Sequence, residues 1–163
     1  MAPYRGAKAG LGYEQMTTNG SSMVLLFRVG DRVCALPLAH VSEIMRALPV
    51  DAITDVPGVC GLAVIRGAVT PVVAPGALFG DPDPRLTHFI VVRAGRRAAA
   101  LAVDAVLGVF DLDGAADLPR LAKGAAGSRL DAIAVRDAEF LFVLNSAGIV
   151  PDEVWRKLGA AER

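Results

Sequence analysis

Two cysteines and two histidines are the residues of this chain that could support nucleophilic chemistry. His40 could act as a base for Cys34 or Cys60 and so generate a thiolate nucleophile. Both cysteines lie in apolar settings, VCA and VCG in sequence letters, which are typical of small buried thiols in a reducing compartment. A Cys-His hydrolase is therefore an alternative that requires an exposed thiol within hydrogen-bond reach of His40.

Other patterns that carry chemistry are weak or missing. The histidines and cysteines are too widely spaced for a zinc site, and we expect His88 to open a strand with its ring exposed. The run Asp111-Leu112-Asp113-Gly114 is similar to the start of a calcium loop but lacks the distal glutamate. No glycine-rich stretch fits the phosphate-binding pattern GxxxxGK followed by Ser or Thr. We therefore expect no catalytic residue, no metal and no cofactor.

Charge and hydropathy exclude further classes of protein. The chain has 163 residues, 53% of them hydrophobic, with 17 basic and 17 acidic side chains, so it can bury a core but has no basic surplus for nucleic acid. No apolar run approaches the roughly 18 residues that span a bilayer. No apolar region follows Arg5 and Lys8, so we expect no secretion signal.

Arg66 stands out because it interrupts the apolar stretch 61–69. An unpaired guanidinium is expensive to bury, so this side chain must reach a carboxylate, backbone carbonyls or solvent. One interpretation is a structural ion pair with Glu43 or Asp104, and the other is an exposed anchor in a recognition groove. The residues alone favour neither.

The elements that position these residues are mostly short strands. Residues 1–22 are expected to form a flexible tail, and residues 23–38 a β-hairpin around a Gly-Asp turn. The spacing of Val41, Ile44 and Met45 predicts one or two helical turns. The remaining expectations are strands at 64–65, 69–73, 131–136 and 139–144, a connector at 81–85, a loop at 111–128, and a helix at 151–159 that Gly159 ends.

The chain contains an internal repeat. Residues 24–45 align without gaps on residues 89–110 at a constant offset of 65, with both hairpin turns matched. The identical pairs are Arg28 and Arg93, Gly30 and Gly95, Arg32 and Arg97, Ala35 and Ala100, Leu36 and Leu101, and Val41 and Val106. The same offset pairs Cys34 with Ala99, a position expected in a core strand. Two related β-rich halves are therefore predicted, as barrels or a sandwich.

Four stretches together resemble the CheW-type coupling proteins of bacterial chemotaxis. They are FRVGDRVCALPLAHVSEIM, VPGVCGLAVIRGAVTPVV, FIVVRAGRRAAALAVDAVLGV and FLFVLN, and together they span about residues 23–150. The resemblance implies a mainly β fold of two small five-stranded SH3-like barrels that share an apolar core, with a short C-terminal helix. The CheW-like domain would cover residues 23–159, as two intertwined halves that start near residues 24 and 89.

The resemblance also implies a function. Members of this family are cytoplasmic, non-enzymatic adaptors that join the tip of a chemoreceptor's helical hairpin to the regulatory domain of the histidine kinase CheA, at the inner face of membrane receptor arrays. Neither nucleic acid nor membrane insertion is implied. Two alternatives stay open: an adaptor of an accessory pathway such as pilus motility or biofilm control, and a kinase modulator without receptor binding.

Site residues carry over position by position. The resemblance implies a receptor-binding groove whose residues are Val41, Glu43, Arg66, Val106 and Val109. It places Gly61 and Gly67 at the contact with the kinase, and Asp104 matches the aspartate of the family's V-D pair.

The sequence also departs from the family pattern. Ala74, Val64 and Ala100 replace an aspartate, an asparagine and a glycine that are common in the family. The loss of the carboxylate at Ala74 implies that this edge of the barrel is held differently.

Overall fold

The computed structural model describes residues 23–52, 56, 58–80, 86–94, 96–111, 116–117, 130–136 and 139–161. Its strands are β1 Met23–Val29, β2 Arg32–Pro37, β3 Val41–Arg46, β4 Val59–Ile65, β5 Ala68–Val73, β6 His88–Ala94, β7 Arg97–Val103, β8 Ala105–Asp111, β9 Ala116–Asp117, β10 Leu130–Arg136 and β11 Glu139–Leu144. Short 3-10 helices are η1 Leu38–His40, η2 Pro75–Phe79 and η4 Ser146–Gly148, and the α-helix is α3 Asp152–Ala161. The expected tail at 1–22 and connector at 81–85 lie outside the described residues, as does most of the loop at 111–128.

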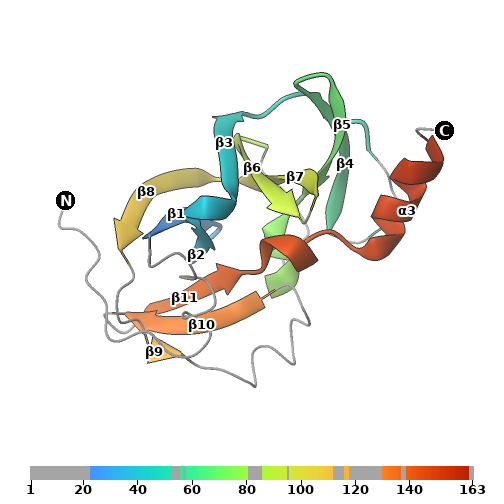
Figure 1. Ribbon diagram of the computed structural model, residues 1–163. Coiled ribbons are helices and arrows are strands. Elements are labelled where there is room, and N and C mark those ends of the chain that lie inside the picture. The colour runs from blue at the N-terminus through green and yellow to red at the C-terminus, as the bar shows by residue number, and fades with distance from the viewer. Residues whose placement is uncertain are drawn as a thin grey trace.

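The strands form two sheets. One has the order β8-β1-β2-β11-β10-β9, and the other has the order β3-β6-β7-β5-β4 (Figure 1). Neighbouring strands are antiparallel, except that β11 runs parallel to β2 and β5 parallel to β7. This confirms the expected mainly β fold with a short C-terminal helix; where two five-stranded barrels were expected, the described residues form one six-stranded and one five-stranded sheet.

The internal repeat is visible in the strand pairing. The pair Phe27–Cys34 of the first hairpin recurs as Val92–Ala99 of the second, at the offset of 65. The β4–β5 hairpin recurs as β10–β11 at an offset of 71, and each has a register shift at the same place. The third strand of each repeat is exchanged, because β3 pairs with β6 and β8 pairs with β1. The two halves are therefore interlocked.

Each repeat opens with a hairpin, β1–β2 or β6–β7, and both faces of these hairpins are buried. In β1, Leu25 and Phe27 face the large central cluster, whereas Val24 and Leu26 face a second cluster within their own half. The second half repeats the pattern, with Ile90 and Val92 in the central cluster and Phe89 and Val91 in a third. Two buried faces explain the uninterrupted apolar runs VLLF and FIVV. The central cluster is the shared apolar core.

The helical turns predicted at residues 41–45 are wrong. These residues belong to β3, whose side chains alternate between half-buried and exposed. The strand forms because β6, more than 40 residues further along the chain, supplies its hydrogen-bonding partners. A local apolar spacing of three and four residues carries no information about that partner. At the other end of the chain, α3 is confirmed but continues past Gly159 to Ala161.

Candidate interaction surface at the sheet edges

Arg66 occupies the tight turn between β4 and β5. Arg66 and Gly67 both have left-handed backbone, with φ of 51° and 78°. This conformation is typical of a two-residue hairpin loop, in which asparagine, aspartate or glycine is favoured at the first position. A branched or long side chain there is strained, so the turn does not by itself explain an arginine. The reason for an arginine at this position must therefore lie in the contacts that its side chain makes.

The guanidinium of Arg66 reaches Glu43 on β3. Nε donates to one carboxylate oxygen at 2.7 Å and Nη2 donates to the other at 3.0 Å. The Arg66 side chain is 78% exposed, and that of Glu43 is 26% exposed. The hydrogen bond lowers the pKa of Glu43 and raises that of Arg66, so both groups are charged at neutral pH. Arg66 therefore forms the expected ion pair with Glu43 and keeps an exposed side chain, and its role as an anchor in a recognition groove stays a prediction.

This ion pair joins two ends of the same sheet. β3 is one edge of the five-stranded sheet and β4 is the other. The chain after β3 also reaches β4, where Asp51 and Leu62 exchange two backbone hydrogen bonds of 2.8 Å. The sheet therefore curls until its edges are linked by a backbone bridge and by the Glu43–Arg66 pair.

Gly61 makes this bridge possible. Its φ is +150°, and a Cβ at this position would lie 2.0 Å from the carbonyl oxygen of Asp51. No other residue allows so close an approach of two backbone segments. Gly61 is buried, whereas Gly67 is exposed with open space around it. Of the two glycines expected at the kinase contact, only Gly67 lies on the surface.

The three valines of the expected groove are divided between two edge strands. Val41 on β3 and Val106 on β8 are half-buried and pack against the central core. Val109 on β8 is 46% exposed and lies on the other sheet from Glu43 and Arg66. Ile44 on β3 is 44% exposed and is the repeat counterpart of Val109, although sequence reasoning missed it. The offset of 65 contained that signal.

Asp104, the other carboxylate considered for Arg66, has a different partner. Its Oδ2 accepts a hydrogen bond from the backbone nitrogen of Gly30 at 2.6 Å, and its own nitrogen donates to the carbonyl of Arg28. Asp104 thus fixes the turn of the first hairpin against the β7–β8 junction. Ala74, which replaces a family carboxylate, is buried, and its backbone N–H donates a hydrogen bond to the carbonyl oxygen of Gly58.

The cysteines and histidines do not assemble a nucleophilic site. Cys34 is fully buried, and burial raises its pKa to about 12, with a smaller opposing effect from the charge of Arg32. Burial also raises the pKa of the half-buried Cys60. The Nδ1 atom of His40 lies 2.6 Å from the hydroxyl of Ser146 instead.

The remaining chemistry-bearing groups give no metal site. His88 opens β6 as expected but is half-buried, not exposed, and its Nδ1 atom is buried without a hydrogen-bond partner. Within the described ranges, no group of three or more His, Cys, Asp or Glu side chains could hold a metal ion. No helix in this part of the chain is both long and apolar enough to cross a bilayer.

Comparisons with known proteins agree with this architecture. The family model described as CheW-like domain matches residues 23–154. The chemotaxis protein CheW of Rhizobium meliloti (strain 1021) is 36% identical over 93 residues, which cover 55% of this chain and only 60% of that protein. The crystal structure of the scaffolding protein TtCheW from Thermoanaerobacter tengcongensis superposes with a TM-score of 0.66 at 21% identity, over 77% of this chain and 89% of that chain.

Proposed function

The chain belongs to the CheW-like domain family, and we propose that it couples the cytoplasmic tip of a chemoreceptor to the histidine kinase CheA. Proteins of this family are non-enzymatic scaffolds, and this chain is one of them. The buried thiol of Cys34 is consistent with this assignment, since a group with a pKa of about 12 is not a nucleophile at neutral pH. The adaptor would act in the cytoplasm at the inner face of receptor arrays.

The observation that carries the receptor part of the proposal is the Glu43–Arg66 pair. Arg66 keeps a strained turn conformation and a largely exposed guanidinium, and arginine is enriched at the energetic centres of protein interfaces. The exposed apolar side chains of Ile44 and Val109 lie on the two edge strands. Exposed apolar side chains and a fixed pair of opposite charges are both features that suit the binding of an amphipathic receptor helix.

A second surface is proposed for the kinase. At the tip of the β4–β5 hairpin, Val64 and Val69 form a cross-strand pair and are 63% and 45% exposed. Gly67 lies between them in the turn of the same hairpin. Gly61, on β4 of this hairpin, allows the backbone of Asp51 to approach closely. Exposed paired valines form an apolar patch that a partner protein would cover.

The receptor surface is tested by co-sedimentation with receptor cytoplasmic fragments and CheA from the same cell. Arg66→Ala is expected to weaken receptor binding by about 10- to 100-fold, the range for a central interface arginine. The matched control is Arg46→Ala, which removes an exposed arginine from the end of β3. Unchanged receptor affinity of Arg66→Ala would contradict a role of Arg66 in receptor binding. A wild-type protein that binds CheA but not the receptor would favour the kinase modulator without receptor binding.

The kinase surface is tested in the same assembly. Val64→Glu is expected to reduce CheA binding and the stimulation of autophosphorylation, while receptor binding is retained because Arg66 and Glu43 are untouched. Loss of both activities in a folded variant would contradict two separate surfaces. An adaptor of pilus motility or biofilm control would form the same assembly, but only with the receptor and kinase of that pathway.

A further inference from the structure

Each half of the molecule contains an arginine whose guanidinium lies over an aromatic ring. Arg32 on β2 lies 4.6 Å from the ring centre of Phe79, and Arg97 on β7 lies 5.0 Å from that of Trp155. The two arginines are repeat counterparts at the offset of 65. Phe79 ends η2, which follows β5, whereas Trp155 lies on α3, which follows β11. Each helical segment therefore leaves one sheet and covers the arginine of the other.

The two contacts differ in what lies beside the ring. Phe142 on β11 packs edge-on against Phe79, with 4.6 Å between ring centres and 61° between the planes. The offset of 71 between β5 and β11 makes Pro71 the counterpart of Phe142, and Val69 the counterpart of Phe140. Of these two counterparts, Val69 lines a pocket together with Trp155.

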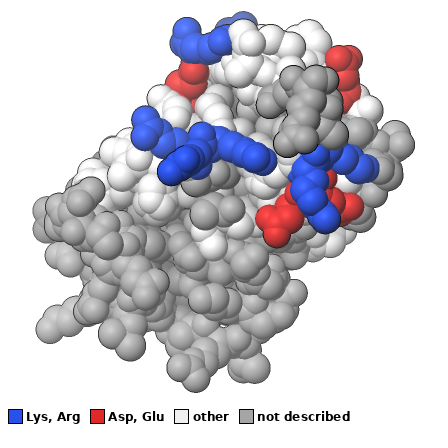
Figure 2. Space-filling view, turned by 45° about the vertical axis from the view of Figure 1, so that its right-hand side comes forward, with Lys and Arg blue, Asp and Glu red and all other residues white. Residues whose placement is uncertain are grey.

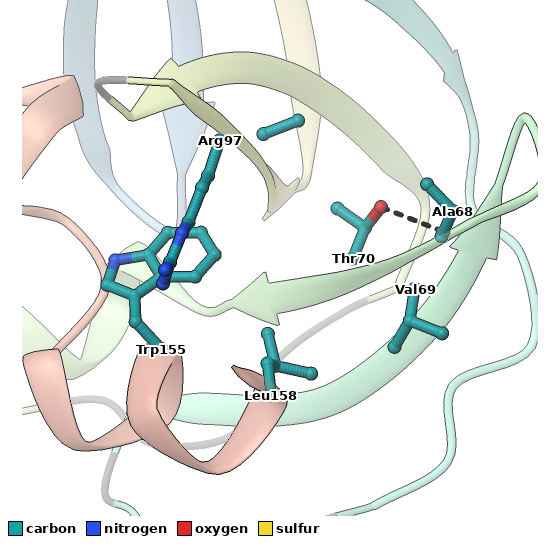
Figure 3. Close-up of a pocket in the computed structure, with 7 residues that line it drawn as sticks. Ala68, Val69, Thr70, Arg97, Trp155 and Leu158 are labelled. Atoms are coloured by element: carbon teal, nitrogen blue, oxygen red, sulfur yellow. Dashed lines mark hydrogen bonds between the residues drawn. The ribbon is translucent and has the colours of Figure 1, made fainter. Parts of the chain in front are cut away.

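The pocket beside Trp155 is large enough for a small ring. It has a volume of about 200 Å³, and its lining residues include Ala68, Val69, Thr70, Arg97, Trp155 and Leu158 (Figure 3). The hydroxyl of Thr70 is turned to the carbonyl of Ala68, so it does not make the pocket polar. A cavity of about 150 Å³ is enough to hold a benzene ring. The pocket can thus hold one aromatic side chain.

Basic side chains outnumber acidic ones near the pocket. Arg97 lines it, and Arg93 and Arg96 are exposed on the same β6–β7 hairpin. None of the three pairs with a carboxylate of the residues that the structure describes. Figure 2, which turns the α3 side of the molecule forward, shows several basic side chains on this face with acidic side chains beside some of them. Exposed arginines without a carboxylate partner attract the carboxylates of another molecule.

We propose that this pocket binds an aromatic side chain of a partner protein, presented on a segment with carboxylates on either side of it. The ring fills the space beside Val69 and Trp155, which both line the pocket. The flanking carboxylates pair with the arginines of the β6–β7 hairpin. The pocket shares Val69 with the surface proposed for the kinase, and binding of a peptide to the protein alone depends on neither the receptor nor the kinase.

Trp155 is the only tryptophan of the chain, so its fluorescence reports directly on the pocket. The probe is the peptide acetyl-Glu-Glu-Phe-Glu-amide, titrated into the full-length protein. We expect a saturable change in emission that weakens at least tenfold when alanine replaces the phenylalanine of the peptide. Raising the salt concentration should weaken it further, because the carboxylate contacts are screened.

Protein variants locate the binding site. Arg97→Gln should weaken peptide binding at least fivefold, whereas Arg32→Gln removes the counterpart contact in the other half and should leave peptide binding unchanged. Val69→Phe restores the aromatic ring of the other half and should abolish binding. Because Val69 is 45% exposed, this variant should fold, and an unchanged melting temperature checks that it does.

Two results would overturn the proposal. Equal binding of the alanine peptide would show that the arginines attract charge alone and that the pocket holds no ring. The chain itself offers an exposed Phe140 next to the exposed Glu139, so a second copy is the competing occupant. Concentration-dependent association of the protein alone, abolished by Phe140→Ala, would assign the pocket to self-association.

Discussion

Replacing Gly61 by alanine should destabilise this protein much more than the same change at Gly67. Both glycines lie in the β4–β5 hairpin and both have positive φ, +150° and +78°. A Cβ at Gly61 would lie 2.0 Å from the carbonyl oxygen of Asp51 and 2.7 Å from its carbon, both backbone atoms. A Cβ at Gly67 would have no neighbour within 4 Å. The pair thus separates backbone strain from backbone collision.

The expected magnitudes follow from these contacts. A non-glycine residue in a disfavoured backbone region costs about 1–3 kcal/mol. At Gly61 the collision must also separate Asp51 from Leu62, and the two hydrogen bonds lost contribute about 1–3 kcal/mol together. Gly61→Ala should therefore reduce the free energy of unfolding by about 2–6 kcal/mol. Gly67→Ala carries only the strain, about 1–2 kcal/mol.

Urea unfolding, followed by Trp155 emission and by circular dichroism, measures the free energy of unfolding of both variants. For a domain of this size, the melting temperature should fall by roughly 5–20 °C for Gly61→Ala and by roughly 2–8 °C for Gly67→Ala. The reasoning would be refuted if Gly61→Ala lost no more stability than Gly67→Ala. Amide exchange at Leu62 adds a local readout, because its protection depends on the bridge to Asp51.

Native Cys34 should resist iodoacetamide at pH 8, because its pKa of about 12 leaves almost no thiolate, and Cys60 should react slowly; mass spectrometry of the labelled peptides would expose an error if native Cys34 reacted fast. The pKa of Glu43 is lowered from 4.5 in the folded state, so the stability from its pair with Arg66 is present at neutral pH and is lost as the pH falls through the lowered value. The difference in melting temperature between wild type and Glu43→Gln should accordingly be smaller at pH 3 than at pH 7, and a difference independent of pH would argue against the pair. Val154→Ala removes two methyl groups from a fully buried side chain of α3 and should lower the free energy of unfolding by about 2 kcal/mol in urea; a loss below about 0.5 kcal/mol would mean that α3 adds little to the core.

The parts of the fold that depend on neighbouring residues could be predicted. Both hairpins of the repeat are confirmed because apolar runs and a turn within a few residues define them. The terminal helix is confirmed for the same reason, since the acidic residues Asp152 and Glu153 lie in its first turn. The strand β3 was predicted wrongly because its partner β6 lies far along the chain.

The candidate site shows the same division. The cost of burying an unpaired guanidinium predicted that Arg66 reaches a carboxylate, backbone carbonyls or solvent, with Glu43 and Asp104 as the carboxylates considered; in the structure it pairs with Glu43 and is exposed to solvent. The approach of Asp51 to Gly61 could not be predicted, because it depends on how far the sheet curls. The stacking of Arg97 on Trp155 depends on α3 crossing to the opposite sheet. No pattern of neighbouring residues in the sequence predicts that crossing.

The exchange of β3 and β8 has a consequence for synthesis on the ribosome. When residues 23–46 emerge, β1 lacks β8 and β3 lacks β6, so both strands leave the ribosome with unpaired edges. The second partner of β1, the strand β8, begins about 80 residues after β1 begins. At ordinary translation rates this is a delay of about 4–16 s. During that interval the nascent chain exposes the runs VLLF and VCAL as a template for other strands. The first half of the protein therefore cannot complete its strand pairing until the second half has been made.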